Sequence, residues 1–109
     1  MVAATAKSSL SPERSRLVEW MQTVNFGRLE QLLVRGGEPV FTPPPRVIRD
    51  IKLGGDNGAR PEAARADFEL KREVRELFAH LEAIGDGVVH CLEVKHGLPF
   101  KMTVEEVPA

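Results

Sequence analysis

Apolar residues recur at helical spacing soon after the N-terminus of this 109-residue sequence. Ser11 and Pro12 are typical of the N-cap and first turn of a helix. The apolar positions that follow at intervals of three or four residues are Leu17, Trp20, Met21 and Val24. The pattern predicts a helix from residue 12 with one buried face, and Gly27 is expected to end it as a left-handed C-cap.

A second, longer helical pattern occupies the chain between residues 63 and 84. Its apolar face consists of Ala63, Ala66, Leu70, Val74, Leu77, Phe78, Leu81 and Ile84. Opposite charges at helical spacing, such as Arg72 and Glu76, favour a solvent-facing side. Gly85 stops the pattern, and the polar segment 54–61 that precedes it predicts a loop.

Each helical pattern is followed by two apolar segments joined by a glycine-containing turn. The four segments cover residues 28–34, 38–41, 88–95 and 98–107. The connecting dipeptides, Gly36-Gly37 and His96-Gly97, are typical of two-residue hairpins, because both turn residues need a positive φ. A proline follows two residues after each turn, and its missing amide donor predicts that the returning strand lies at a sheet edge.

Residues 46–53, between the first hairpin and the polar loop, fit two structures. Val47, Ile48 and Ile51 would share one face of a short helix, which Gly54 would end. Strand alternation fails, because Arg49 falls between Val47 and Ile51. We therefore expect a helix here.

The two helix–hairpin segments resemble one another at an offset of sixty residues. Residues 27–39, GRLEQLLVRGGEP, align with residues 87–99, GVVHCLEVKHGLP, with five identities. A duplicated unit and shared physical demands both explain this match. Either way, the sequence predicts an α+β fold in which two αββ units form a four-stranded antiparallel sheet with the helices packed on one face. The side chains expected to be most buried are Trp20, Leu77, Leu81, Phe100 and Met102.

The strand alternation slips in the first strand of both hairpins. Leu29 and Leu32 fall on opposite faces, and Val89 and Cys91 fall opposite Leu92. A bulge in each strand would reset the alternation by one residue. Otherwise the second face of the sheet is partly apolar, which would suit a dimer interface formed by Leu29, Val89 and Cys91.

Length and composition fit one soluble domain, residues 11–109, after a small and polar tail, residues 1–10, that we expect to be disordered. Hydrophobic residues make up 42% and charged residues 28%, which is ordinary for a globular protein. No membrane span or signal peptide is evident, and the single cysteine suits a reducing compartment. The sequence therefore predicts a cytoplasmic protein, and its general character resembles that of compact bacterial proteins.

Residues that carry chemistry are sparse. The three histidines and Cys91 lack the paired spacing that is typical of metal sites, and no nucleophile elbow or Walker-type phosphate loop occurs. We therefore predict no catalytic, cofactor-binding or metal-binding residue, and no cofactor.

Basic residues on or beside the hairpins are the remaining candidates for a site. These are Arg28, Arg35, Lys95 and Lys101. Arg35 and Lys95 occupy equivalent turn positions, and two such basic turns could straddle a phosphate backbone. The net charge of −1 and the scarcity of aromatic residues weigh against nucleic acid. The sequence therefore favours a small non-enzymatic binding or adaptor module that contacts proteins, as a homodimer or with another chain, and no membrane. A nucleic-acid-associated regulator is the alternative, and a small enzyme is third.

Overall fold

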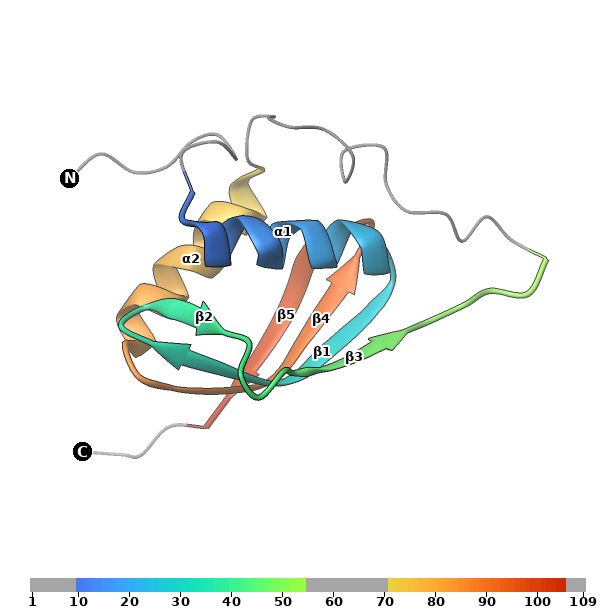
Figure 1. The fold of residues 1–109 in the computed structure, drawn as a ribbon. Helices are drawn as coiled ribbons and strands as arrows, with labels where there is room; N and C mark the ends of the chain where they lie inside the picture. The colour runs from blue at the N-terminus through green and yellow to red at the C-terminus, as the bar shows by residue number, and fades with distance from the viewer. Residues whose placement is uncertain (1–9, 55–70, 106–109) are drawn as a thin grey trace.

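The computed structural model describes residues 10–54 and 71–105 of the chain. Figure 1 shows the helices and strands that these residues form. In chain order they are α1 (Pro12–Val24), β1 (Gly27–Arg35), β2 (Glu38–Val40), β3 (Arg46–Arg49), α2 (Arg72–Ile84), β4 (Gly87–Lys95) and β5 (Leu98–Val104). All strand pairs are antiparallel and both helices lie on one face of the sheet, so the predicted α+β class is confirmed.

The sheet has the strand order β2-β1-β4-β5, and β3 pairs with β1 beyond the end of β2. The four predicted strands are therefore present, and β3 is a fifth. Pro39 of β2 lies opposite Val34 of β1, and Pro99 of β5 lies opposite Val94 of β4. Both prolines thus occupy outer strands, where an absent amide donor costs no sheet hydrogen bond.

The core lies between the helices and the two central strands, β1 and β4. Its buried apolar side chains are Leu17, Val18, Met21, Val24, Leu29, Leu32, Val34, Val74, Leu77, Phe78, Leu81, Val89, Leu92 and Val94. Leu77 and Leu81 are buried as predicted, whereas Trp20 and Met102 are only partly buried against this core.

Helix α1 begins as predicted, because the Ser11 side chain accepts a hydrogen bond from the Arg14 amide at 3.2 Å. Its end differs from the prediction. Asn25, with φ of 64°, takes the C-cap position and donates its amide to the Met21 carbonyl. Gly27 opens β1 instead, and its place demands glycine for another reason: a Cβ there would collide with the Ile48 carbonyl of β3.

Helix α2 begins at Arg72, after Lys71 in extended conformation. The prediction of one continuous helix from residue 63 is therefore wrong at Lys71. The buried face starts at Val74, and a helix gains most of its stability where such a face packs. Residues 55–70, with most of the predicted loop, lie outside the described residues, as do residues 1–9. Leu10, assigned to the tail, packs against the core.

Residues 46–49 form strand β3, so the helix predicted over residues 46–53 is wrong. The short strand β2 covers only Leu33–Arg35 of β1, which leaves the backbone groups of Gly27–Glu30 without a partner on that side. Strand β3 supplies that partner. The adjacent β-branched residues Val47 and Ile48 also favour an extended chain.

The two hairpins turn where the sequence predicts. Gly36 and Gly37 have φ of 57° and 77°, and His96 and Gly97 have φ of 54° and 73°. Each turn also contacts the helix of the other unit. The Gly37 amide donates to the Gly85 carbonyl at 2.8 Å, and the Gly97 amide donates to the Asn25 carbonyl at 2.9 Å.

The two helix–hairpin units are arranged equivalently around the β1–β4 ladder. Helices α1 and α2, and strands β1 and β4, have bounds sixty residues apart. Gly27 pairs with Val94, and its equivalent Gly87 pairs with Val34, the equivalent of Val94. The same register relates the two units along the ladder, so an approximate two-fold axis passes between these strands. A common origin of the units stays a prediction.

The bulge interpretation explains the slipped alternation. Leu29 and Leu32 are both fully buried, and Gln31 between them has φ of 59°. On β4 the register against β5 shifts between Val89 and Cys91. A local irregularity therefore returns both strands to the same core face.

A second irregularity explains why Phe100 is not buried as predicted. The rung from Glu93 to Lys101 is followed by the rung from Val94 to Pro99, which leaves Phe100 as the extra residue on β5. Its side chain is 59% exposed.

Candidate functional site

Two of the predicted basic residues, Arg28 and Lys101, lie beside carboxylates. Arg28 Nε is 3.0 Å from Glu30 Oε2, and this hydrogen bond raises the pKa of the guanidinium. Lys101 Nζ is 3.8 Å from Glu93 Oε2. Their charge is thus partly neutralised on the sheet surface.

The other two basic residues, Arg35 and Lys95, lie at opposite ends of the sheet. Strands β1 and β4 are antiparallel and nine residues long, so their final residues are roughly 25 Å apart at about 3.3 Å per residue. Lys95 Nζ also lies 4.0 Å from the Phe100 ring centroid. The structure does not bring the two turns together, and nucleic-acid binding through these four residues stays a prediction.

The three residues of the proposed dimer face divide between core and surface. Leu29 and Val89 are fully buried within the single chain, so neither offers surface to a second copy. Cys91 is a free, half-buried thiol opposite Glu30 and Thr103.

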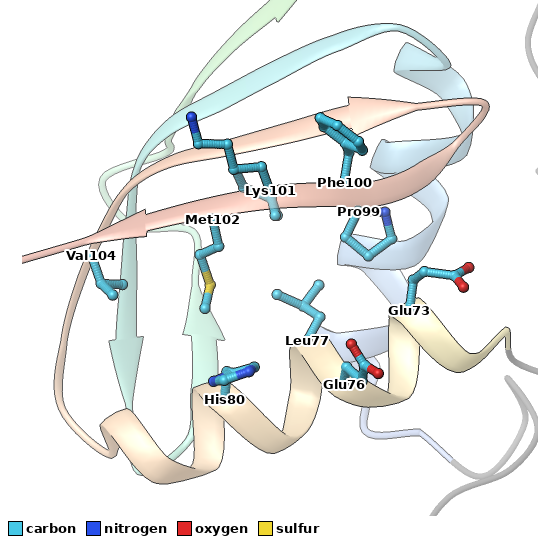
Figure 2. A pocket seen from close by; sticks show the side chains of 10 residues that line it. Glu73, Glu76, Leu77, His80, Pro99, Phe100, Lys101, Met102 and Val104 are labelled. Carbon is cyan, nitrogen blue, oxygen red and sulfur yellow. The ribbon is translucent and has the colours of Figure 1, made fainter.

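Two hollows lie between α2 and β5. One, of about 360 Å³, is shown in Figure 2, where Leu77 and His80 of α2 face Pro99 and Met102 of β5. A second, of about 460 Å³, shares His80, Met102 and Val104 with the first and continues toward the end of α2. Together they form one surface channel, here named the α2–β5 groove.

The floor of the α2–β5 groove is apolar. Leu77 and Leu92 close its base as part of the core. Met102 and Val104 lie partly buried above them. The side chains of Met102 and Val104 point toward α2, whereas those of Phe100 and Lys101 point away from it (Figure 2). A ligand in the groove would therefore cover apolar surface that the fold leaves partly exposed to solvent.

The rim of the α2–β5 groove is mainly acidic. Its carboxylates are Glu73, Glu76, Asp86 and Glu105, and Lys101 is the one lysine or arginine among the residues that line it. Glu76 pairs with Arg72 at 3.0 Å, and Glu105 lies 3.6 Å from His90. The rim favours a cationic ligand, because like signs would repel an anionic one.

Strand β5 adds a third property to the groove. It ends the strand order, and within the described ranges no strand pairs with its outer side. It is seven residues long, whereas β2, its equivalent in the first unit, has three residues. A long open edge exposes backbone donors and acceptors that can pair with another extended chain.

The equivalent gap in the first unit is filled by aromatic side chains. Trp20, sixty residues before His80, packs on Phe41 with ring centroids 4.7 Å apart. Arg16 lies over the Phe41 ring at 5.8 Å. The hollow beside Phe41 measures about 200 Å³, smaller than either part of the α2–β5 groove. Sequence reasoning missed the groove, although the contrast between Trp20 and His80 was its available signal.

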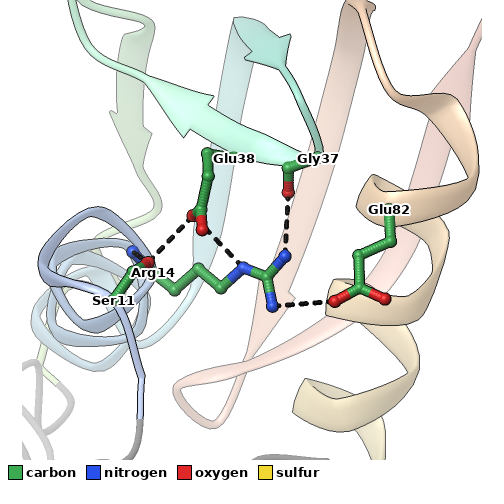
Figure 3. Close-up of polar contacts among 5 residues, drawn as sticks. All are labelled: Ser11, Arg14, Gly37, Glu38 and Glu82. Carbon is green, nitrogen blue, oxygen red and sulfur yellow. Dashed lines mark hydrogen bonds and ion pairs between the residues drawn. The ribbon is translucent and has the colours of Figure 1, made fainter. Parts of the chain in front are cut away.

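Sequence reasoning also missed the role of Arg14. Figure 3 shows its guanidinium between β2 and α2, 3.2 Å from Glu38 Oε2 and 3.1 Å from Glu82 Oε1. It also donates to the Gly37 carbonyl at 3.2 Å. With 15% of its side chain exposed, Arg14 joins the two units at the end of the molecule opposite the second turn.

No three His, Cys, Asp or Glu side chains gather at a possible metal site within residues 10–54 and 71–105. Neither α1 nor α2, the helices of the described part, has the length and apolarity that a membrane crossing requires. Comparisons with known protein families, with curated proteins and with solved structures found no match for this chain.

Proposed function

We propose that this chain is a cytoplasmic, non-enzymatic module that binds other proteins through the α2–β5 groove. Its ligand is an extended segment in which apolar residues alternate with lysine or arginine. The observation that carries the proposal is the coincidence of an apolar floor, an acidic rim and a long open edge strand in one place.

An alternating ligand follows from the geometry of an extended chain. Backbone pairing with β5 would add a strand to the sheet, a common mode of peptide recognition. Successive side chains of that strand point to opposite faces, so alternate residues can reach Met102 and Val104. The intervening cations leave on the opposite face, so their long, flexible side chains would have to curve around the edge strand to approach Glu73 and Glu76.

The assignment to the cytoplasm is supported by composition. The chain has a single cysteine, and Cys91 is a free thiol. Proteins without disulfides are typical of reducing compartments.

The direct test is the binding of a designed peptide. A fluorescent peptide of alternating valine and lysine, about eight residues or roughly 25 Å long, is titrated with the protein. A matched peptide of alternating valine and glutamate is the control. Rising fluorescence anisotropy with the lysine peptide alone supports the proposal. Equal binding of both peptides would overturn it.

Two matched variants assign that binding to the groove. Glu73 and Glu13 occupy the second position of α2 and α1, and both are exposed. Glu73→Lys should weaken peptide binding at least about threefold, the effect of a reversed surface charge. Glu13→Lys makes the same change in the first helix–hairpin unit, whose gap is filled by Trp20 and Phe41, and should leave peptide binding unchanged. Equal losses in both variants would mean that net charge, not the groove, attracts the peptide.

A further inference from the structure

Exposed apolar side chains gather on one surface of the described chain. The large ones are Val47, Ile51, Leu53 and Phe100, with 50%, 60%, 92% and 59% of their surface exposed. Three of the four lie on residues 46–53, here named the basic arm, and the fourth lies on β5. Apolar groups concentrated in this way mark interaction surfaces. The basic arm is therefore expected to be covered in the working protein, whereas Phe100 points away from α2 and already lies beside Lys95.

The basic arm has the chemistry that the α2–β5 groove requires. It carries Arg46, Arg49 and Lys52 against the single acidic residue Asp50. Val47, Arg49 and Ile51 fall on one side of an extended chain, so apolar and basic groups are interleaved. Figure 1 shows the segment that follows β3 leading away from the body of the molecule.

The end of the basic arm beyond β3 is long enough to cover part of the groove. Helix α2, which forms one wall of the groove, has thirteen residues and spans roughly 20 Å. Six residues of extended chain cover about the same distance at roughly 3.3 Å each. Residues 46–49 of the arm are paired with β1, and the Asp50 amide donates to the Phe26 carbonyl at 2.8 Å. Residues 51–53 can therefore enter the groove, and at roughly 10 Å of extended chain they cover about half its length.

The arm cannot fill the groove of its own chain. Strand β3 pairs with β1, and β4 lies between β1 and β5. The arm and the outer side of β5 therefore lie on opposite edges of the sheet, with three strand spacings, roughly 14 Å, between β3 and β5. The projecting segment also leads away from β5 (Figure 1).

We propose that the α2–β5 groove binds the basic arm of a second copy of this chain. The inference rests on the proposed binding function and names its partner. Arg49, Ile51 and Leu53 share one side of the extended arm. On that side Ile51 and Leu53 cover the floor beside Met102, and Arg49 faces the acidic rim. Lys52 lies on the opposite side, and its long side chain approaches the rim around the edge of β5. A two-fold axis lets each copy give its arm and receive its partner's, so the exchange closes as a dimer.

Charge reversal provides the test. Arg49→Glu with Lys52→Glu reverses the arm, and Glu73→Lys with Glu76→Lys reverses the rim. In analytical ultracentrifugation of the full chain, the wild type should sediment as a dimer and each variant alone as a monomer. An equimolar mixture should restore the dimer, because each reversed arm then meets a groove of opposite sign. An unfolded variant could not give this result.

Three outcomes would overturn the inference: a monomeric wild type, variants that remain dimeric, or a mixture that stays monomeric. The proposed function has a separate readout in the valine–lysine peptide. The arm variant keeps its groove and should bind this peptide at least as well as the wild type. A monomeric wild type that binds the peptide would overturn only the arm exchange, whereas failure of every form to bind it would overturn the proposed function.

Discussion

The two helix–hairpin units share a backbone plan but treat the gap between helix and outer strand differently. In the first unit Trp20 and Phe41 fill the gap, and a short strand β2 is followed by β3. In the second unit His80 takes the place of Trp20, and the seven-residue strand β5 leaves a groove. The comparison shows that the backbone alone does not make the site: side-chain volume at equivalent positions closes one gap and leaves the other open.

The difference also separates stability from binding. Aromatic packing in the first unit covers apolar surface within the chain, which stabilises the fold. In the second unit Met102 and Val104 are only partly buried. Their remaining exposure leaves apolar surface that a partner could cover, which is why we propose the second unit as the binding surface.

The largest effect is expected where the two units are alike. Leu81 and its equivalent Met21 are both fully buried in the shared core. Leu81→Ala and Met21→Ala should each lower the free energy of unfolding by about 2–5 kcal/mol, the usual range for such truncations. Urea denaturation measures both. A loss below about 0.5 kcal/mol at either position would mean that the units do not share one core.

A smaller but asymmetric effect is expected at the residues that differ. Trp20→Ala removes the ring that packs on Phe41 and should cost about 2 kcal/mol, less than a fully buried aromatic side chain. His80→Ala removes an exposed side chain from the groove wall and should change stability by less than about 0.5 kcal/mol. Similar losses in thermal and urea denaturation would show that both gaps are packed alike.

The glycines that open β1 and β4 provide a third comparison. Gly27 has φ of 154°, and an added Cβ would collide with the Ile48 carbonyl. Gly87 meets only the end of the Ile84 side chain, at 3.0 Å. Gly27→Ala should therefore cost at least about 1 kcal/mol more than Gly87→Ala, as expected for strained backbone against a side chain that can move. Equal midpoints of unfolding would contradict the pairing of β3 with β1.

The smallest effect is expected at the surface pair between Lys101 and Glu93. The two side chains are 65% and 39% exposed, and exposed ion pairs contribute little. Lys101→Ala should change the free energy of unfolding by at most about 0.3 kcal/mol, with even less effect at high salt. It also removes the basic residue that lines the groove, so binding of the valine–lysine peptide should improve. Weaker peptide binding would contradict an acidic rim as the attracting feature.

Local chemistry explains which parts of the fold the sequence predicts. The turns at Gly36-Gly37 and His96-Gly97 follow from the positive φ that each position needs, and Ser11 and Pro12 define the start of α1. Strand β3 depends instead on a distant cause, the uncovered edge of β1. The helical spacing of residues 46–53 is real, but pairing with that edge outweighs it.

The groove was harder to predict because it results from packing between distant segments. Its floor combines α2, β4 and β5, and a bulge on β5 turns Phe100 away from α2. The basic candidates failed to converge because antiparallel central strands separate Arg35 from Lys95. Aligned halves reveal that His80 replaces Trp20, but only the fold shows that both positions face a gap.

The claim that the second gap is the binding site is tested most directly by methyl NMR during titration with the valine–lysine peptide. The resonances of Met102 and Val104 should shift progressively, because these side chains form the groove floor. Those of Met21 and Val18, buried beneath the first helix, should stay in place. Shifts confined to the first unit, or unchanged Met102 and Val104 resonances with the peptide bound, would contradict the account.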